Sequence, residues 1–143
     1  MSTVAEILKA KGNTVVHQIR PDSSVLEAMR SMAVHGIGAL LVHDGERVVG
    51  IVTERDYARK ILLHGRASES TPVSDIMTPG VMYVSPEDDS MACMALMTER
   101  RMRHLPVMEG ARLVGLISIG DLVKNIIDEQ QFIIDQLERY IAG

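Results

Sequence analysis

Two short segments of this chain place a hydroxyl side chain and a carboxylate at the same spacing. They are Gly50-Ile51-Val52-Thr53-Glu54-Arg55-Asp56 and Gly115-Leu116-Ile117-Ser118-Ile119-Gly120-Asp121. A hydroxyl followed three residues later by an acid is typical of a helix start, where the two side chains form a capping box. Thr53 and Ser118 therefore predict the beginning of a helix in each segment.

The same residues could also bind a phosphate and a ribose. Unpaired N–H groups and the helix dipole attract an anion to a helix start, and the hydroxyl adds a donor. The carboxylate of Asp56 or Asp121 can accept hydrogen bonds from both hydroxyls of a ribose, as an acid does in dinucleotide-binding folds. Capping alone is the simpler interpretation of one motif, but its recurrence favours a binding site in addition.

Basic residues gather near both motifs in a chain whose net charge is −4: Arg55 near the first, and Arg100, Arg101, Arg103 and His104 before the second. For Arg100 and Arg101 a solvated basic face is the alternative. Gly38 and Ala39 stand in the first half where Arg103 and His104 stand in the second. This difference predicts two unequal sites, of which the second attracts phosphate more strongly.

The chain contains an internal repeat that must position these residues. A shift of 65 residues lays Pro21–Leu62 over Pro86–Ile127 without a gap, with identities that include Met29/Met94, Met32/Met97, Gly50/Gly115 and Asp56/Asp121. Each copy is too short to bury much surface alone, so we expect the two copies to share a core. We divide the chain at residues 1–71 and 72–143, and the polar run from His64 to Pro72 is the predicted linker.

Each copy predicts the element order β-α-β-β-α, and hence an α+β fold. Extended stretches are expected at 15–19 and 81–84, short preceding helices at 3–10 and 73–77, and hairpins at 39–53 and 104–118 with turns at Gly45 and Gly110. The helices between them present apolar faces made of Val25, Ala28, Met29 and Met32 in the first copy and Met91, Met94 and Met97 in the second. The thioethers of most of the ten methionines then fill a core that has few aromatic side chains.

These features resemble a tandem CBS-domain protein, in which two cystathionine β-synthase motifs form one Bateman module. The resemblance covers the chain from about Val4 to Asp128, and it rests on both glycine-to-aspartate motifs, on Val73-Ser74-Asp75-Ile76-Met77-Thr78 and on Arg103-His104-Leu105-Pro106-Val107. It implies two repeats related by a pseudo-twofold axis, here followed by a long C-terminal helix. It also implies adenine nucleotides or related adenosyl ligands, bound as regulators in clefts between the repeats.

The resemblance assigns roles residue by residue. Asp56 and Asp121 would hold ribose, Thr53 and Ser118 would contact phosphate, and Arg103 and His104 would face the phosphates of the second site. The base would lie against Val16, His17 and Ile37 in the Ser118 site, and against Val81, Met82 and Met102 in the Thr53 site. Because Gly38 and Ala39 replace the basic pair, phosphate binding at Thr53 would depend on Arg55.

Composition and spacing argue against several other classes of function. The acidic chain does not suit a nucleic-acid surface, and no window approaches the length of a membrane span. The N-terminal residues lack the apolar core of a signal peptide, so we expect a cytoplasmic protein. The five histidines and the single Cys93 show no metal-ligand spacing, and Cys93 is predicted to be a small buried core residue. No catalytic frame is present either, so we expect no enzyme and no required cofactor.

The C-terminal tail from Asp121 to Ile141 is long for a helix that ends a repeat. Its apolar residues recur at helical spacing and outlast the repeat, which favours a homodimer contact over packing on its own domain. The sequence thus predicts a stand-alone regulatory module that senses AMP, ADP, ATP, NAD or S-adenosylmethionine and signals to a separate, unidentified protein partner. The alternative is a constitutive interaction adaptor whose nucleotide site does not function.

Overall fold

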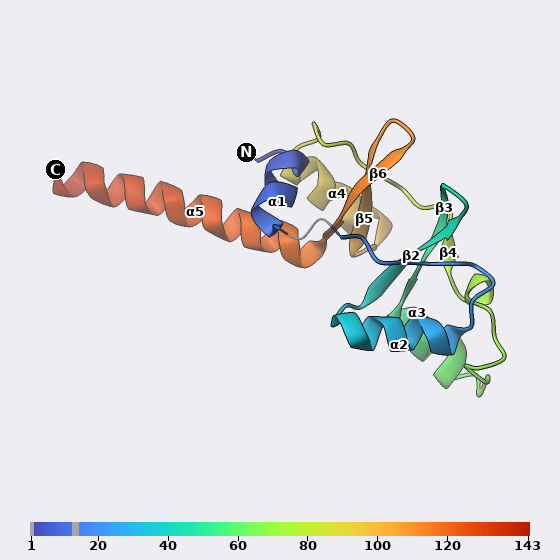
Figure 1. The fold of residues 1–143 in the computed structure, drawn as a ribbon. Helices are drawn as coiled ribbons and strands as arrows, with labels where there is room; N and C mark the ends of the chain where they lie inside the picture. The colour runs from blue at the N-terminus through green and yellow to red at the C-terminus, as the bar shows by residue number, and fades with distance from the viewer. Residues whose placement is uncertain (1, 13–14) are drawn as a thin grey trace. The chain divides into compact units, whose positions relative to one another are not determined.

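The computed structural model describes residues 2–12 and 15–143, which form two compact units. One unit, here called the first-copy unit, is Val16–Val81. The other, here called the second-copy unit, combines the described residues up to Val15 with Met82–Gly143. Met1, where the first predicted half begins, lies outside the described residues. Each unit is an α+β structure, so the predicted fold class is confirmed (Figure 1).

The first-copy unit is built on a four-stranded sheet in the order β1-β2-β3-β4. Its elements are β1 (Gln18–Ile19), α2 (Val25–His35), β2 (Ala39–Asp44), β3 (Arg47–Thr53), α3 (Glu54–Tyr57), the π-helix η1 (Ala58–Leu62), the 3-10 helix η2 (Val73–Asp75) and β4 (Thr78–Pro79). Strand β1 is parallel to β2, whereas β2, β3 and β4 pair antiparallel. Thr53 is the last residue of β3 and the N-cap of α3, so the first motif runs from the strand directly into the helix.

The second-copy unit repeats this plan around a two-stranded sheet. Its elements are α1 (Val4–Lys11), α4 (Ser90–Arg100), β5 (His104–Glu109), β6 (Arg112–Ser118) and α5 (Ile119–Ala142). The extended stretch predicted at residues 81–84 contributes one parallel bridge, from Val84 to Val107, which matches the pairing of Ile19 with Val42 in the first copy. The hairpin turns are as predicted, with positive φ at both Gly45 and Gly110 (61° and 63°).

The short leading segments do not pack where the sequence boundaries at 1–71 and 72–143 place them. Segment α1 precedes the first copy but packs on the second, where the Val4 N–H donates to the carbonyl of Asp88 at 2.8 Å. Segment η2 precedes the second copy but packs on the first, where the Val73 N–H donates to Ser23 at 2.8 Å. Since Ser23 and Asp88 are repeat equivalents, α1 and η2 hold equivalent places, so the two compact units exchange their leading segments relative to the division of the sequence at residues 71 and 72.

Each unit has its own core of buried aliphatic and methionine side chains. In the first-copy unit Val25, Ala28 and Met32 of α2 pack with the sheet residues Leu40 and Val42. In the second-copy unit Cys93 and Met97 of α4 are buried, which confirms the prediction for Cys93. The prediction for Met91 was wrong: its side chain is 50% exposed, and Ser90, the equivalent of Val25, occupies the buried position instead.

Candidate functional site

Both glycine-to-aspartate motifs form complete capping boxes in the structure. In the first copy the Asp56 N–H donates to Thr53 Oγ1 at 3.2 Å, and the Thr53 N–H donates to Asp56 Oδ2 at 3.0 Å. In the second copy the corresponding distances are 3.1 Å to Ser118 Oγ and 2.9 Å to Asp121 Oδ2. The predicted helix starts are therefore confirmed. In both boxes the cap uses the Oδ2 oxygen of the carboxylate.

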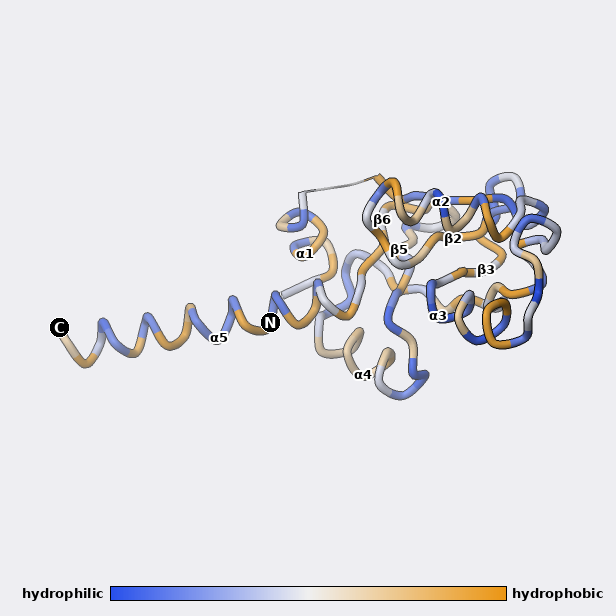
Figure 2. Tube along the Cα trace, turned by 90° about the horizontal axis from the view of Figure 1, so that it is seen from below, coloured by the Kyte–Doolittle hydropathy of each residue, from blue (hydrophilic) through white to orange (hydrophobic). Residues whose placement is uncertain are grey.

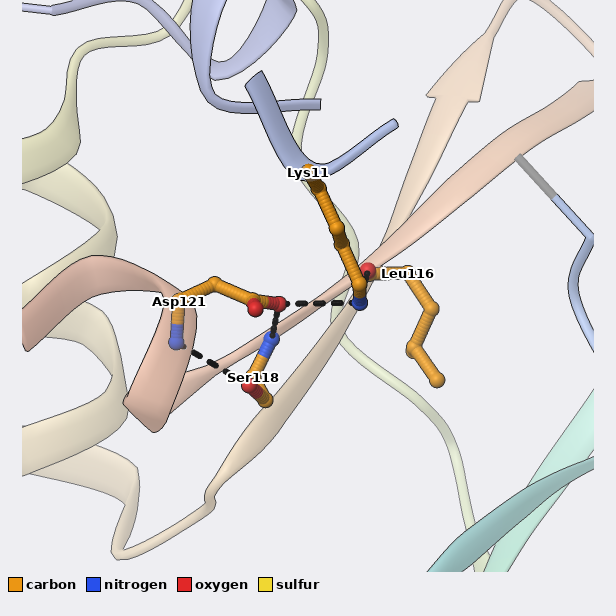
Figure 3. A network of polar contacts seen from close by, with 4 residues as sticks. All are labelled: Lys11, Leu116, Ser118 and Asp121. Atoms are coloured by element: carbon orange, nitrogen blue, oxygen red, sulfur yellow. Dashed lines mark hydrogen bonds and ion pairs between the residues drawn. The ribbon is translucent and has the colours of Figure 1, made fainter. Parts of the chain in front are cut away.

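The second-copy carboxylate has a further partner, Lys11. Its Nζ lies 2.9 Å from Asp121 Oδ2 and donates to the Leu116 carbonyl at 3.1 Å (Figure 3). Lys11 is the last residue of α1, which Gly12 ends in a left-handed conformation with φ 76°. The last residue of α1 thus places a positive charge beside the first turn of α5. Among the described residues, no hydrogen bond is made to Asp121 Oδ1, so the carboxylate keeps an acceptor oxygen.

The electrostatics of Asp121 follow from these contacts. Burial alone would raise the pKa of the carboxyl, because a charged group loses hydration. The hydrogen bond from the Ser118 N–H and the hydrogen bond and charge of Lys11 outweigh burial, and the pKa of Asp121 is lowered. Asp121 is therefore an anion throughout the neutral range.

The first-copy carboxylate is held differently. Lys60 stands one turn further along the chain, with Nζ 3.7 Å from Asp56 Oδ1 and a hydrogen bond of 2.8 Å to the Ile76 carbonyl. Lys60 belongs to the same copy as Asp56, whereas Lys11 reaches Asp121 from the leading segment. Neither lysine is among the site residues predicted from the sequence. The spacing of four residues from Asp56 was a usable signal for Lys60, but no local pattern signals Lys11.

The strand register places different residues beside the two motifs, and the predicted difference in phosphate binding stays a prediction. His104 pairs with Ser118 in the β5–β6 ladder, and the Arg103 carbonyl accepts the Ile119 N–H at 2.8 Å. In the first copy Ala39 pairs with Thr53, and the Gly38 carbonyl accepts the Glu54 N–H at 3.1 Å. The helix start of the second copy therefore carries the basic pair directly beside it. Arg55, on which the first-copy site would depend, is an exposed residue of α3.

His104 is electrically neutral near pH 7 in this environment. Burial lowers the pKa of His104 below its ordinary value of 6.5, the positive charges of Lys11 and Arg103 lower it further, and Asp121 acts in the opposite direction. The imidazole thus offers a donor or an acceptor without a net charge. A phosphate placed beside it would raise its pKa, because the anion favours the protonated form.

We expect His104 to make the stability of the protein depend on pH. The unfolded chain binds a proton near pH 6.5, whereas the folded chain does so only at lower pH, so stability falls as the pH drops from 7 through 6.5 toward the folded pKa. In His104→Gln this part of the dependence disappears. The measurement is urea unfolding of both proteins between pH 5 and pH 8, and parallel curves for the two proteins would contradict the prediction.

The remaining predicted residues belong to the walls for a base. Val16, His17, Ile37 and Val81 lie in the first-copy unit, and Met82 and Met102 lie in the second-copy unit. The His17 ring stacks on His35 with centroids 3.8 Å apart, and Met102 packs against the second-copy core. All of the predicted wall residues except Val81 belong to the unit that does not contain the carboxylate they would serve. Their role as walls for a base stays a prediction.

Histidine, cysteine and acidic side chains could supply metal or thiol chemistry. Within residues 2–12 and 15–143, no group of three or more His, Cys, Asp or Glu side chains is placed to hold a metal ion. Burial raises the pKa of Cys93 to about 11, with Asp88 and Asp89 adding to the effect, so its thiol stays protonated at neutral pH. The same part of the chain contains no helix with the length and apolar character needed to cross a membrane.

Two copies of one β-α-β-β-α unit, each with a capped helix start after its last strand, define a tandem CBS-domain protein. The CBS domain model matches residues 4–63 and 73–128, and the chain belongs to this family. The CBS domain-containing protein CBSX3, mitochondrial, of Arabidopsis thaliana is 39% identical over 150 residues, which cover 99% of this chain and 73% of that protein.

Solved structures agree with this assignment. A protein with CBS domains from Burkholderia ambifaria MC40-6 is 54% identical with a TM-score of 0.86, and the match covers 90% of this chain and 96% of that one. A hexameric CBS-CP12 protein from bloom-forming cyanobacteria is 28% identical with a TM-score of 0.77, and the match covers 86% of this chain and 70% of that one. Pairs of CBS domains are generally regulatory modules that often bind adenosine ligands, and some CBS-domain proteins form oligomers.

Proposed function

We propose that this protein is a non-enzymatic regulatory module that binds an adenosine-containing ligand such as AMP, ADP, ATP, NAD or S-adenosylmethionine. The carboxylates of Asp56 and Asp121 accept the ribose hydroxyls, and Thr53 and Ser118 donate to phosphate. The second-copy site takes the more highly charged ligand, because Lys11 and Arg103 add positive charge near it and a bound phosphate would favour the protonated form of His104. Binding changes the affinity for a separate protein partner, and the module itself is a homodimer.

One observation carries this proposal: the capping box engages Oδ2 of Asp121, while Oδ1 accepts no hydrogen bond from the described residues. Capping and ribose binding therefore use different lone pairs of the carboxylate and do not exclude each other. The pKa of Asp121 is also lowered, so the acceptor is charged when a ligand arrives.

The contact between Lys11 and Asp121 favours a second candidate function. A cation that already neutralises the carboxylate at 2.9 Å is compatible with a constitutive adaptor that has kept its caps and lost its ligand. In that case the capping box would contribute only to stability, by about 0.5–2 kcal/mol.

Calorimetric titration with the five ligands distinguishes the two candidates. We expect at least one of them to bind, and mass spectrometry to recover it chemically unchanged. Failure of all five to bind would support the adaptor, and conversion of a ligand would contradict the non-enzymatic assignment.

The cytoplasmic location expected from the sequence is a separate prediction, because the Arabidopsis relative is named as mitochondrial. Fractionation of the source cells tests it.

A further inference from the structure

Helix α5 extends beyond the residues that pack on its own unit. Its first half packs on that unit, where Leu122 is buried and both Asn125 and Glu129 hydrogen-bond the Ser2 hydroxyl. From Gln131 to the end of α5 every residue is exposed. Figure 1 shows this half of α5 extending past α1 and away from the other elements of the second-copy unit.

The exposed residues of α5 follow a heptad pattern. Alternating steps of four and three connect Val123, Ile127, Gln130, Ile134, Leu137 and Ile141. A flanking row with a step of seven adds the partly buried Ile126 and the exposed Ile133 and Tyr140. The apolar members of the first row are 44–83% exposed, and Figure 2 shows hydrophobic and hydrophilic stretches alternating along α5. A seven-residue repeat is the pattern with which one helix packs along another.

The charges on α5 favour another protein helix over a membrane surface. Asp128, Glu129, Asp135 and Glu138 outnumber Lys124 and Arg139 between positions 122 and 142. Helices that lie on membranes carry a basic polar face that attracts anionic lipid, and an acidic face is repelled. A second copy of the same chain offers the same heptad pattern, so it can cover the apolar row completely.

The residues that flank the row decide the orientation of such a pair. In a parallel pair, Ile133 would lie beside the partner's Glu138 on both edges, an apolar side chain against an acid. In an antiparallel pair centred near Phe132, one edge brings Ile133 next to the partner's Ile133 and Ile126 next to the partner's Tyr140. The other edge brings Lys124 next to the partner's Glu138, twice by symmetry. Only the antiparallel pair separates an apolar edge from a charge-complementary edge.

We propose that α5 is the homodimer surface of this protein and that two copies of it pair antiparallel. Val123 then packs against the partner's Ile141, Ile127 against the partner's Leu137, and Gln130 near the symmetry axis fixes the register. The inference rests on the homodimer included in the proposed function, but it is independent of ligand binding.

Sedimentation velocity of the wild type, Ile134→Asp and Phe132→Asp tests the surface. Both substitutions add one negative charge to the exposed half of α5, but Phe132 lies outside the two apolar rows although it is 64% exposed. At micromolar concentration we expect dimers of the wild type and of Phe132→Asp and monomers of Ile134→Asp, with a cooperative thermal unfolding transition in all three and a lower Tm only for the monomeric variant. A wild-type monomer overturns both the homodimer and the surface. A dimer of Ile134→Asp overturns the surface alone, and the ligand titration is unaffected in either case.

A charge exchange tests the orientation. Lys124→Glu places two acids next to each other across an antiparallel pair, and we expect the dissociation constant of the dimer to rise roughly tenfold. The double variant Lys124→Glu with Glu138→Lys restores both pairs and with them the dissociation constant. Dissociation constants that do not respond to the single exchange, or do not recover in the double variant, overturn the antiparallel arrangement.

Discussion

Asp121→Asn is expected to lose the ligand of the second-copy site while the protein keeps its fold. The amide is as large as the carboxylate and can still accept the Ser118 N–H, whose present distance is 2.9 Å. It cannot offer a charged acceptor to two ribose hydroxyls, and a hydrogen bond to a charged group is worth about 1.5–3 kcal/mol. We therefore expect the affinity to fall by roughly 10- to 100-fold or more. Calorimetry with the ligand identified for the wild type measures this loss.

Lys11→Met is the matched control for this variant. It removes the same ion pair, whose side chains are 32% and 22% exposed, but it leaves the carboxylate in place. Adenosine is the suitable ligand, because it has the ribose and lacks the phosphate that Lys11 would attract. The affinity for adenosine should not fall in Lys11→Met, whereas it should fall in Asp121→Asn. If Asp121→Asn bound the ligand as the wild type does and only unfolded more readily, the residue would be a helix cap and the adaptor would be favoured.

Much of the local structure around the two motifs could be predicted from the repeat. The equivalence of the two copies predicts the strands, the glycine turns and both helix starts. It also placed Arg103 and His104 at the strand entrance, where His104 pairs with Ser118. These features depend on neighbouring residues of one copy, and such local preferences are readable from sequence.

Lys11 could not be assigned to Asp121 in the same way. The ion pair depends on α1 packing on the second copy, and neighbouring sequence suggests instead that α1 belongs to the first copy. What decides the packing is the entry of Val4 and Ile7 into the second-copy core and the hydrogen bond of Val4 to Asp88. These contacts join residues far apart in the sequence, and helical periodicity carries no information about them.

Met91 shows the limit of periodicity within a single helix. Residues 91, 94 and 97 fit one helical face, but so do residues 90, 93, 94 and 97, and the two faces differ by a small rotation. The structure buries Ser90, Cys93 and Met97 and leaves Met91 half-exposed. A serine at a buried position is unusual for its type, so hydrophobicity favoured the wrong neighbour.

Gly50 and Gly115 are equivalent positions of the two copies, but substitution by alanine is expected to cost much more stability at Gly50 than at Gly115. A Cβ on Gly50 would lie 2.9 Å from the Thr78 carbonyl oxygen and 2.7 Å from Met77 Sδ. Thr78 belongs to β4, which pairs with β3 beside Gly50, so its backbone cannot move away without losing that pairing. A Cβ on Gly115 would meet the Leu8 side chain, with its two methyl carbons at 2.8 Å and its Cγ at 3.4 Å, and a side chain can change rotamer.

We therefore expect Gly50→Ala to destabilise the protein by about 1–3 kcal/mol or more and Gly115→Ala by clearly less. Neither glycine has a positive φ, so the two substitutions do not differ in backbone strain. In a chain of this size the larger cost corresponds to a fall in Tm of roughly 3–12 °C. Thermal and urea unfolding of both variants measure the difference. Equal losses of stability in the two variants would contradict the prediction. They would mean that the β4 backbone at Thr78 moves away from a Cβ as easily as the Leu8 side chain does.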